Sequence, residues 1–141
     1  MVRYNVEGVA MPAMATRQTE EWIEQVAAFY GKRLGEVNYI FTDDAGILDI
    51  NRKFLGHDYY TDIITFDYTA ADILSGDLYI SLDTVTTNAI QVGATYEDEL
   101  YRVIIHGILH LCGINDKGPG EREIMEAAED KALALLKTYL K

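Results

Sequence analysis

The stretch His106–Asp116 reads HGILHLCGIND and holds two of the three histidines of the chain. Valine and isoleucine residues precede it, so we expect a largely buried helix at the centre of the fold. On a helix, His106 and His110 lie one turn apart on the same face, where both imidazoles can reach one metal ion. Histidines also occur at this spacing by chance, so a pair without a shared ligand is the alternative.

The residues that follow favour a metal site. Gly113 ends the helix and permits a left-handed turn that folds the chain back toward the histidines. Asp116 comes three residues later, and the pattern H-x-x-x-H-x-x-G-x-x-D predicts Asp116 as a third ligand. Three protein ligands leave a fourth position for water, as in catalytic zinc sites. The alternatives are that Asp116 is a turn residue, or that the Asn115 amide serves as a weaker ligand.

Two further residues of this stretch bear on the class of enzyme and on the set of metal ligands. Gly107 stands where metalloproteases with the motif H-E-x-x-H carry the glutamate that activates water, which argues against a protease. A glycine inside a helix costs about 1 kcal/mol relative to alanine, which indicates a close approach by a substrate, another backbone or a packed sheet. Cys112 lies about 200° round the helix from His110, so we expect a buried thiol rather than a ligand.

The composition is that of a globular protein. The chain has 141 residues, 49% apolar and 25% charged, which predicts one domain over residues 1–141. No stretch is apolar for long enough to cross a membrane, the N-terminal segment is a poor signal peptide, and there is one cysteine, so we expect a cytoplasmic protein. The formal net charge is −11, so any contact with nucleic acid must be local, metal-assisted or arranged by a larger partner.

Hydrophobic periodicity predicts an α+β fold in which about five helices pack on a small mixed four-stranded sheet. The metal site is expected on a central helix and in the loop after it. Strands are predicted at 2–9, 36–43, 61–68 and 76–83, and helices at 17–33, 45–55, from 84, from 95 to the histidines, and at 121–141. Thr16 and the pair Asp43-Asp44 are the predicted helix caps. The apolar helix faces are predicted to contain Trp22, Val26, Phe29, Tyr30, Ile47, Ile50, Phe54, Ile124, Ala128, Leu135 and Leu136.

HGILHLCGIND resembles the signature of the YbeY family of single-strand-specific metallo-endoribonucleases, H-G-x-L-H-L-x-G-Y-D-H. Three more stretches match that family in the same order: NRKFLGHDYYTDIITFDY at 51–68, GDLYISLD at 76–83 and ELYRVIIHGILHL at 99–111. The resemblance is strong from Asn51 to Asp116. It implies one Zn²⁺ per chain held by His106, His110 and Asp116.

This chain departs from the family pattern at two places. Asp116 replaces the third histidine of the family, and aspartate is also a competent zinc ligand. Leu55 stands where the family commonly has an arginine near the metal, and Arg52 or His57 could reach the scissile phosphate instead. For Arg52 the alternative is a solvated helix face. Arg102 lies on the histidine face of its helix, although it could simply pair with Glu99 or Asp98.

The resemblance implies cleavage of single-stranded RNA in the maturation of the 16S rRNA 3′ end and in late-stage quality control of the 70S ribosome. The expected partners are rRNA and ribosomal or small-subunit proteins. Two alternatives belong to other classes: a non-catalytic ribosome-associated module with structural zinc, and a metal-dependent hydrolase of another substrate. The acidic net charge favours the first alternative, because binding could run through basic ribosomal proteins.

Overall fold

The structure, a computed structural model, describes residues 1–59 and 61–140. Within these residues the chain forms four strands and five α-helices, with a short π-helical turn after the second helix. The strands are β1 (Val2–Val6), β2 (Arg33–Thr42), β3 (Ile63–Asp67) and β4 (Ile73–Ser81). The helices are α1 (Thr16–Phe29), α2 (Asp44–Ile50), η1 (Asn51–Leu55), α3 (Leu82–Val92), α4 (Tyr96–Leu111) and α5 (Glu121–Tyr139). Lys141, the predicted end of the last helix, lies outside the described residues.

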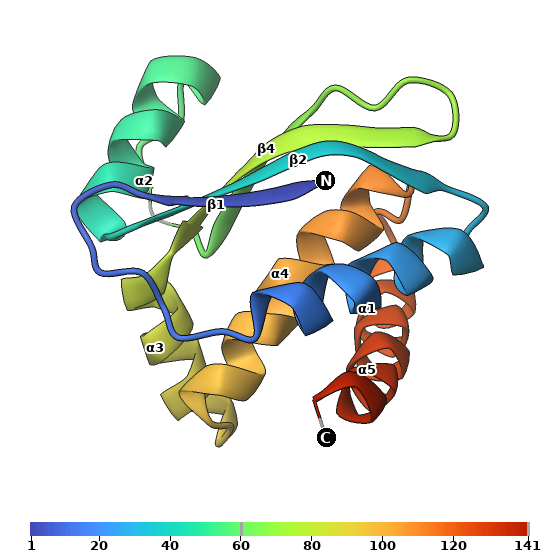
Figure 1. Ribbon diagram of the computed structural model, residues 1–141. Coiled ribbons are helices and arrows are strands. Elements are labelled where there is room, and N and C mark those ends of the chain that lie inside the picture. Colours follow the sequence, from blue (N-terminus) through green and yellow to red (C-terminus); the bar gives the residue numbers. More distant parts are fainter. Residues whose placement is uncertain (60, 141) are drawn as a thin grey trace.

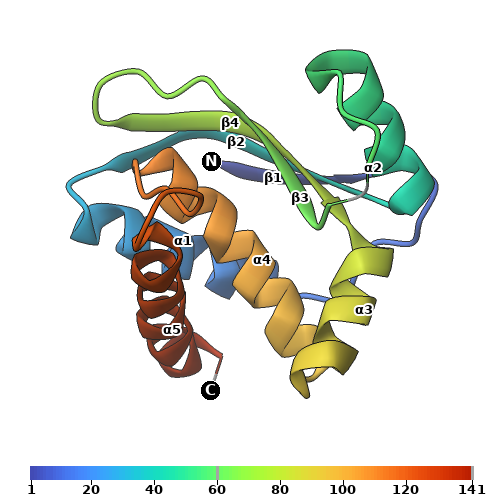
Figure 2. The same cartoon turned by 180° about the vertical axis from the view of Figure 1, so that it is seen from behind.

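The sheet is mixed, which confirms the predicted α+β class. Its strand order is β1-β2-β4-β3, in which β1 and β4 both run parallel to β2, and β3 runs antiparallel to β4. Helices α1, α4 and α5 lie on one side of the sheet, whereas α2 projects on the other side (Figures 1 and 2). In this strand order β3 is an edge strand, and Asp62, the residue directly before it, lines the candidate site described below.

Helix α4 is the central helix because it packs on the sheet and also against α3 and α5. The Tyr39 hydroxyl of β2 donates a hydrogen bond of 2.8 Å to the Ile104 carbonyl in the middle of α4. A Cβ added at Gly107 would collide with Leu78 of β4 and lie 3.0 Å from Ile63 Cδ1 of β3. Of the explanations for this glycine, the structure supports the tight helix–sheet contact.

The boundaries and buried faces of three helices differ from the prediction. Thr16 is the first residue of α1 and not its cap, because Ala15 holds that position without a side-chain hydrogen bond. The predicted cap Asp43 is confirmed, since its side chain accepts from the Gly46 N–H at 2.8 Å. Three side chains expected in the core are exposed: Phe29 by 61%, Phe54 by 62% and Ile124 by 61%.

The exposed residues lie about 100° away from the buried stripe of their helix. In α5 the buried residues are Met125, Glu129, Ala132 and Leu136, so Ile124 points to solvent. In α1 the stripe runs from Thr19 to Ala27, and the exposed Phe29 ring carries the Lys131 ammonium 3.7 Å from its centroid. The buried stripe of α5 therefore includes a glutamate, Glu129, which also lines the candidate site.

Among residues 1–59 and 61–140, none of the helices combines the length and the apolar composition needed to cross a bilayer.

Candidate active site

Helix α4 exposes one narrow stripe to the surroundings. Between Tyr101 and Leu111 every residue is buried except Arg102, His106 and His110, which are half-buried. Their spacing of four residues places all three on the same face of the helix. The sequence prediction that the two histidines share a face of a buried helix agrees with this arrangement.

His106 makes polar contacts through both ring nitrogens. Its Nδ1 lies 2.7 Å from Glu129 Oε2 of α5, and its Nε2 lies 3.4 Å from Asp116 Oδ2. A carboxylate only accepts hydrogen bonds, so the proton of the neutral ring sits on Nδ1 and leaves a lone pair on Nε2. Gly113, with φ of +98°, makes the left-handed turn that returns the chain to the helix and brings Asp116 to His106.

The spacing of His106 Nε2 and Asp116 Oδ2 fits two ligands of one small cation. Two donor atoms at about 2.0–2.1 Å from a tetrahedral zinc ion are about 3.3 Å apart. The observed separation is 3.4 Å. Within the part of the chain that the structure describes, however, no group of three or more His, Cys, Asp and Glu side chains is arranged to hold a metal ion. The three-ligand centre with His110 therefore stays a prediction.

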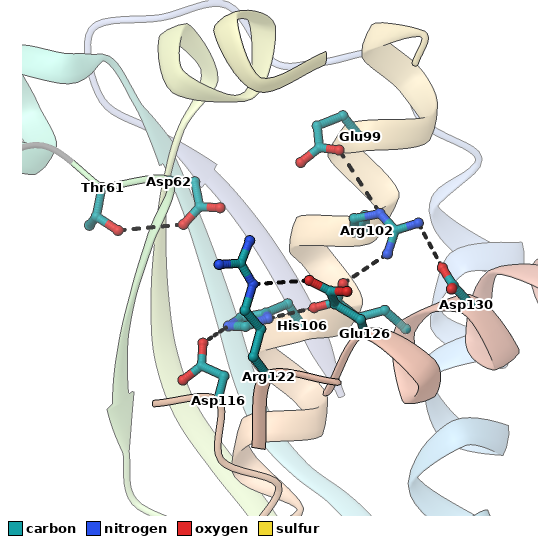
Figure 3. Close-up of polar contacts among 10 residues, drawn as sticks. Thr61, Asp62, Glu99, Arg102, His106, Asp116, Arg122, Glu126 and Asp130 are labelled. Carbon is teal, nitrogen blue, oxygen red and sulfur yellow. Dashed lines mark hydrogen bonds and ion pairs between the residues drawn. The ribbon is translucent and has the colours of Figure 1, made fainter. Parts of the chain in front are cut away.

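Glu129 connects His106 to a second cation. Its Oε1 accepts a 2.8 Å hydrogen bond from Arg102 Nη1, and Arg102 Nη2 donates at 2.9 Å to Asp130 Oδ1. Arg102 Nε is also 4.0 Å from Glu99 Oε1 (Figure 3). Arg102 is therefore held by three carboxylates and is not a free cation for a substrate. The predicted pairing of Arg102 with Glu99 is therefore present, but the two shorter contacts of Arg102 are to Glu129 and Asp130 of α5.

The side chains around His106 line an open cavity of about 330 Å³. His106 and Asp116 lie together in its wall (Figure 3). His110, Arg52 and His57 are not among the residues that line it. The described residues that line the cavity are Asp62, Glu99, Arg102, Val103, His106, Asp116, Arg122, Met125, Glu126 and Glu129.

Arg52 and His57, the two residues expected to assist catalysis, have other partners. Arg52 pairs with Asp58 at the surface. The ring of His57 stacks on Tyr59 with centroids 5.2 Å apart, and its Nδ1 lies 3.0 Å from the Tyr59 hydroxyl. The expected roles of both residues at the scissile phosphate stay predictions. The exposed position of Arg52 agrees with the alternative given for it, a solvated helix face.

Asp62, at the start of β3, is a cavity residue that the sequence did not indicate. Burial raises the pKa of its carboxyl group above the usual value, although the positive charge of His106 opposes this shift. Thr61 Oγ1 lies 3.4 Å from its Oδ1. A carboxyl group with a raised pKa that lines a cavity beside a histidine is a candidate for proton transfer.

The environment of His106 also changes its proton affinity. Burial alone would lower the pKa of the imidazole, but the hydrogen bond and charge of Glu129, with the charges of Asp62 and Asp116, raise it above its usual value. A metal at Nε2 competes with a proton for the same lone pair, so metal affinity should fall as the pH falls.

Cys112 does not take part in the site. The thiol is half-buried against the core, and burial raises its pKa to about 11, so it stays protonated at neutral pH. The side chain is less buried than the sequence predicted. The expectation that Cys112 is not a ligand stays a prediction.

A histidine–carboxylate cluster that lines an open cavity of an α+β fold is a candidate catalytic site. The comparisons with known proteins agree. A family model described as Endoribonuclease YbeY matches residues 5–137. Proteins named Endoribonuclease YbeY from Bacteroides thetaiotaomicron and Phocaeicola vulgatus are 71% and 66% identical to the chain over 134 and 136 residues. These alignments cover 95% and 96% of the chain and 98% and 99% of the relatives.

A solved structure shares the fold. The solution structure of TM1509 from Thermotoga maritima superimposes with a TM-score of 0.67 at 29% identity, covering 96% of this chain and 89% of the other. The chain belongs to the endoribonuclease YbeY family, and the resemblance found in the sequence motifs is confirmed.

Proposed function

We propose that the chain is a zinc-dependent, single-strand-specific endoribonuclease that acts in 16S rRNA 3′-end maturation and in late-stage 70S ribosome quality control. Residues 1–141 act as one catalytic domain in the cytoplasm, with rRNA as substrate and ribosomal or small-subunit proteins as partners. Membership of the endoribonuclease YbeY family supports the activity on RNA. One zinc ion per chain is held by His106, His110 and Asp116.

One observation carries the metal part of this proposal. His106 lies between two carboxylates, so that Glu129 fixes its Nδ1 and Asp116 faces its Nε2 at the separation expected of two zinc ligands. Metal-binding histidines almost always donate their other ring N–H to a carboxylate, carbonyl or water. His110 lies on the same stripe of α4 and supplies the third ligand from one turn further along.

In this proposal Glu129 orients the histidine ligand and Asp62 accepts a proton. A zinc ion bound there supplies Lewis acidity toward a phosphoryl oxygen and lowers the pKa of a coordinated water. Glu129 keeps the Nδ1 proton of His106 in place and so keeps Nε2 available. Asp62 lines the same cavity and, because its pKa is raised, can accept a proton from water near neutral pH more readily than an ordinary aspartate.

The proposal is tested by metal analysis and RNA cleavage with the purified protein. We expect about one zinc per chain in the natural protein and none after His110→Ala. Single-stranded RNA should be cleaved, double-stranded RNA should not, and a chelator should stop cleavage. Cleavage that continues unchanged in chelator would contradict the metal-dependent mechanism. Zinc that binds without any cleavage would favour the non-catalytic module.

Asp62→Asn is expected to stabilise the metal-free protein while reducing cleavage. Because the folded-state pKa of Asp62 is raised above the ordinary value of an aspartate, about 3.9, ionising this carboxyl costs stability, and the cost grows as the pH rises from about 4 through the folded-state pKa. The asparagine variant should therefore match the natural protein at low pH and exceed it by roughly 1 kcal/mol at neutral pH. Cleavage should fall about 100-fold through loss of the proton acceptor.

Urea denaturation in chelator at several pH values measures the first effect. The control is Asp49→Asn, which alters an exposed aspartate that pairs with Lys53 at 3.8 Å. Its stability should change by less than about 0.5 kcal/mol at every pH. Equal cleavage by Asp62→Asn and the natural protein would remove Asp62 from the mechanism.

A further inference from the structure

The cavity beside His106 has an unfavourable charge for an RNA substrate. Among the residues that the structure describes, five carboxylate side chains line it, against two arginines and one histidine. Every nucleotide of RNA adds a negative phosphate, so this lining repels the substrate unless a cation is free to meet it. The carboxylates are Asp62, Glu99, Asp116, Glu126 and Glu129.

The two arginines of the lining differ in how firmly they are held. Arg102 has a side chain only 34% exposed and contacts Glu99, Glu129 and Asp130. Arg122, the second residue of α5, has a side chain that is 79% exposed. Within residues 1–59 and 61–140 its ion pair joins Nε to Glu126 Oε1 at 3.0 Å, and Glu126 is itself 55% exposed. Exposed pairs at i, i+4 contribute little, so Arg122 can exchange this partner for a phosphate.

The position of Arg122 also suits an anion. It lies in the first turn of a 19-residue helix, where the helix dipole is positive. Its guanidinium can form two parallel hydrogen bonds to one phosphate. In the view of Figure 3 Arg122 is drawn in front of His106, and Arg122, His106 and Asp116 all line the same cavity.

We infer that Arg122 binds a backbone phosphate of the single-stranded RNA next to His106 and Asp116. This inference rests on the proposed endoribonuclease function. It gives Arg122 the phosphate contact that the sequence assigned to Arg52 or His57, neither of which lines the cavity. Glu126 then acts as a competitor that the incoming phosphate displaces.

The test is cleavage of a labelled single-stranded RNA oligonucleotide by Arg122→Gln at several salt concentrations. We expect kcat/KM to fall about 10-fold, mainly through KM, because a charge-assisted contact is lost. The slope of log(1/KM) against log salt should become shallower by about 0.7, the value for one phosphate contact on a single strand. Thermal stability should not change, since the side chain is exposed.

The chain offers a matched control. Arg17 and Glu21 form the same i, i+4 pair on α1, with Nε and Oε1 3.3 Å apart and side chains 88% and 50% exposed. Arg17→Gln removes the same charge away from the cavity, so its KM and salt slope should equal those of the natural protein. Glu126→Gln should act in the opposite direction and lower KM by about 2-fold, because it removes the competing carboxylate.

The outcomes separate the inference from the proposed function. If Arg122→Gln and Arg17→Gln have the same KM and salt slope, the phosphate contact is wrong, although the endoribonuclease proposal stands. If the natural protein cleaves no RNA, the proposed function fails first. A KM unchanged by Glu126→Gln would contradict the competition between Glu126 and phosphate.

Discussion

Asp116→Ala is expected to reduce RNA cleavage by at least about 100-fold while the protein stays folded. The substitution removes the carboxylate that lies 3.4 Å from His106 Nε2, and with it one of three proposed zinc ligands. Loss of a residue that hydrogen-bonds a metal ligand typically lowers metal affinity or activity by about 10–100-fold. Loss of the ligand itself should have a larger effect. Asp116 lies in a half-exposed loop, so little stability depends on its side chain.

Asn115→Ala is the matched control for this prediction. Asn115 is the neighbouring residue and the alternative amide ligand, but its side chain is exposed and absent from the lining of the cavity. Zinc content and cleavage should be unchanged in this variant. Asp116→His, which restores the residue usual in the family, should keep zinc. Full cleavage by Asp116→Ala would exclude the carboxylate as a ligand, and unfolding of that variant would indicate a structural ion instead.

The parts of the site that sequence analysis predicted are local in the chain. The spacing of His106 and His110 fixes their shared face because the helix repeats every 3.6 residues. Gly113 and Asp116 follow within ten residues of His106, and a glycine at the end of a helix is a direct signal for the turn. The same local logic predicted four strands and five helices, since each depends on a short hydrophobic pattern.

The parts that were missed depend on contacts between distant segments. Asp62 precedes His106 by 44 positions, and Glu129 follows it by 23. No periodicity within one element encodes which residue of α5 faces α4. One signal was nevertheless present: Glu129 lies in register with Met125 and Ala132 on the buried face of α5, and a buried glutamate needs a partner. The sequence analysis placed Ile124 in the buried stripe instead of Met125. That choice turns the predicted buried face of the helix by about 100°, so Glu129 was not recognised as buried.

The predicted roles of Arg52 and His57 at the phosphate rest on the family resemblance and not on a local pattern. Both follow α2 closely in the sequence and were expected near the phosphate through the family resemblance. Arg52 pairs with Asp58 and His57 stacks on Tyr59 at the surface. Ion pairs and stacking partners of exposed side chains are weak preferences set by the surrounding loop, so they leave no clear pattern in the sequence.

Glu129→Gln should weaken zinc binding by 10–100-fold, the range typical of outer-shell partners. The glutamate presents two acceptor oxygens, one to His106 Nδ1 at 2.7 Å and one to Arg102 Nη1 at 2.8 Å. Glutamine has one acceptor and one NH₂ donor. If the oxygen stays with Arg102, the NH₂ faces Nδ1, and the ring must move its proton to Nε2 to accept that hydrogen bond. Nε2 then carries a hydrogen and cannot donate its lone pair to a metal.

Competition between the protein and a chromophoric chelator for zinc measures this effect without RNA. The control is Asp130→Asn, which removes the other strong partner of Arg102 but does not touch His106. Zinc affinity should be unchanged there, because Asp130 is exposed and the Nδ1 hydrogen bond remains. Glu129→Ala should in addition destabilise the metal-free protein by about 2 kcal/mol, since a half-buried arginine loses its best partner. Equal zinc affinity of Glu129→Gln and Asp130→Asn would show that Glu129 only ties α4 to α5, because an orienting carboxylate must act through the histidine proton.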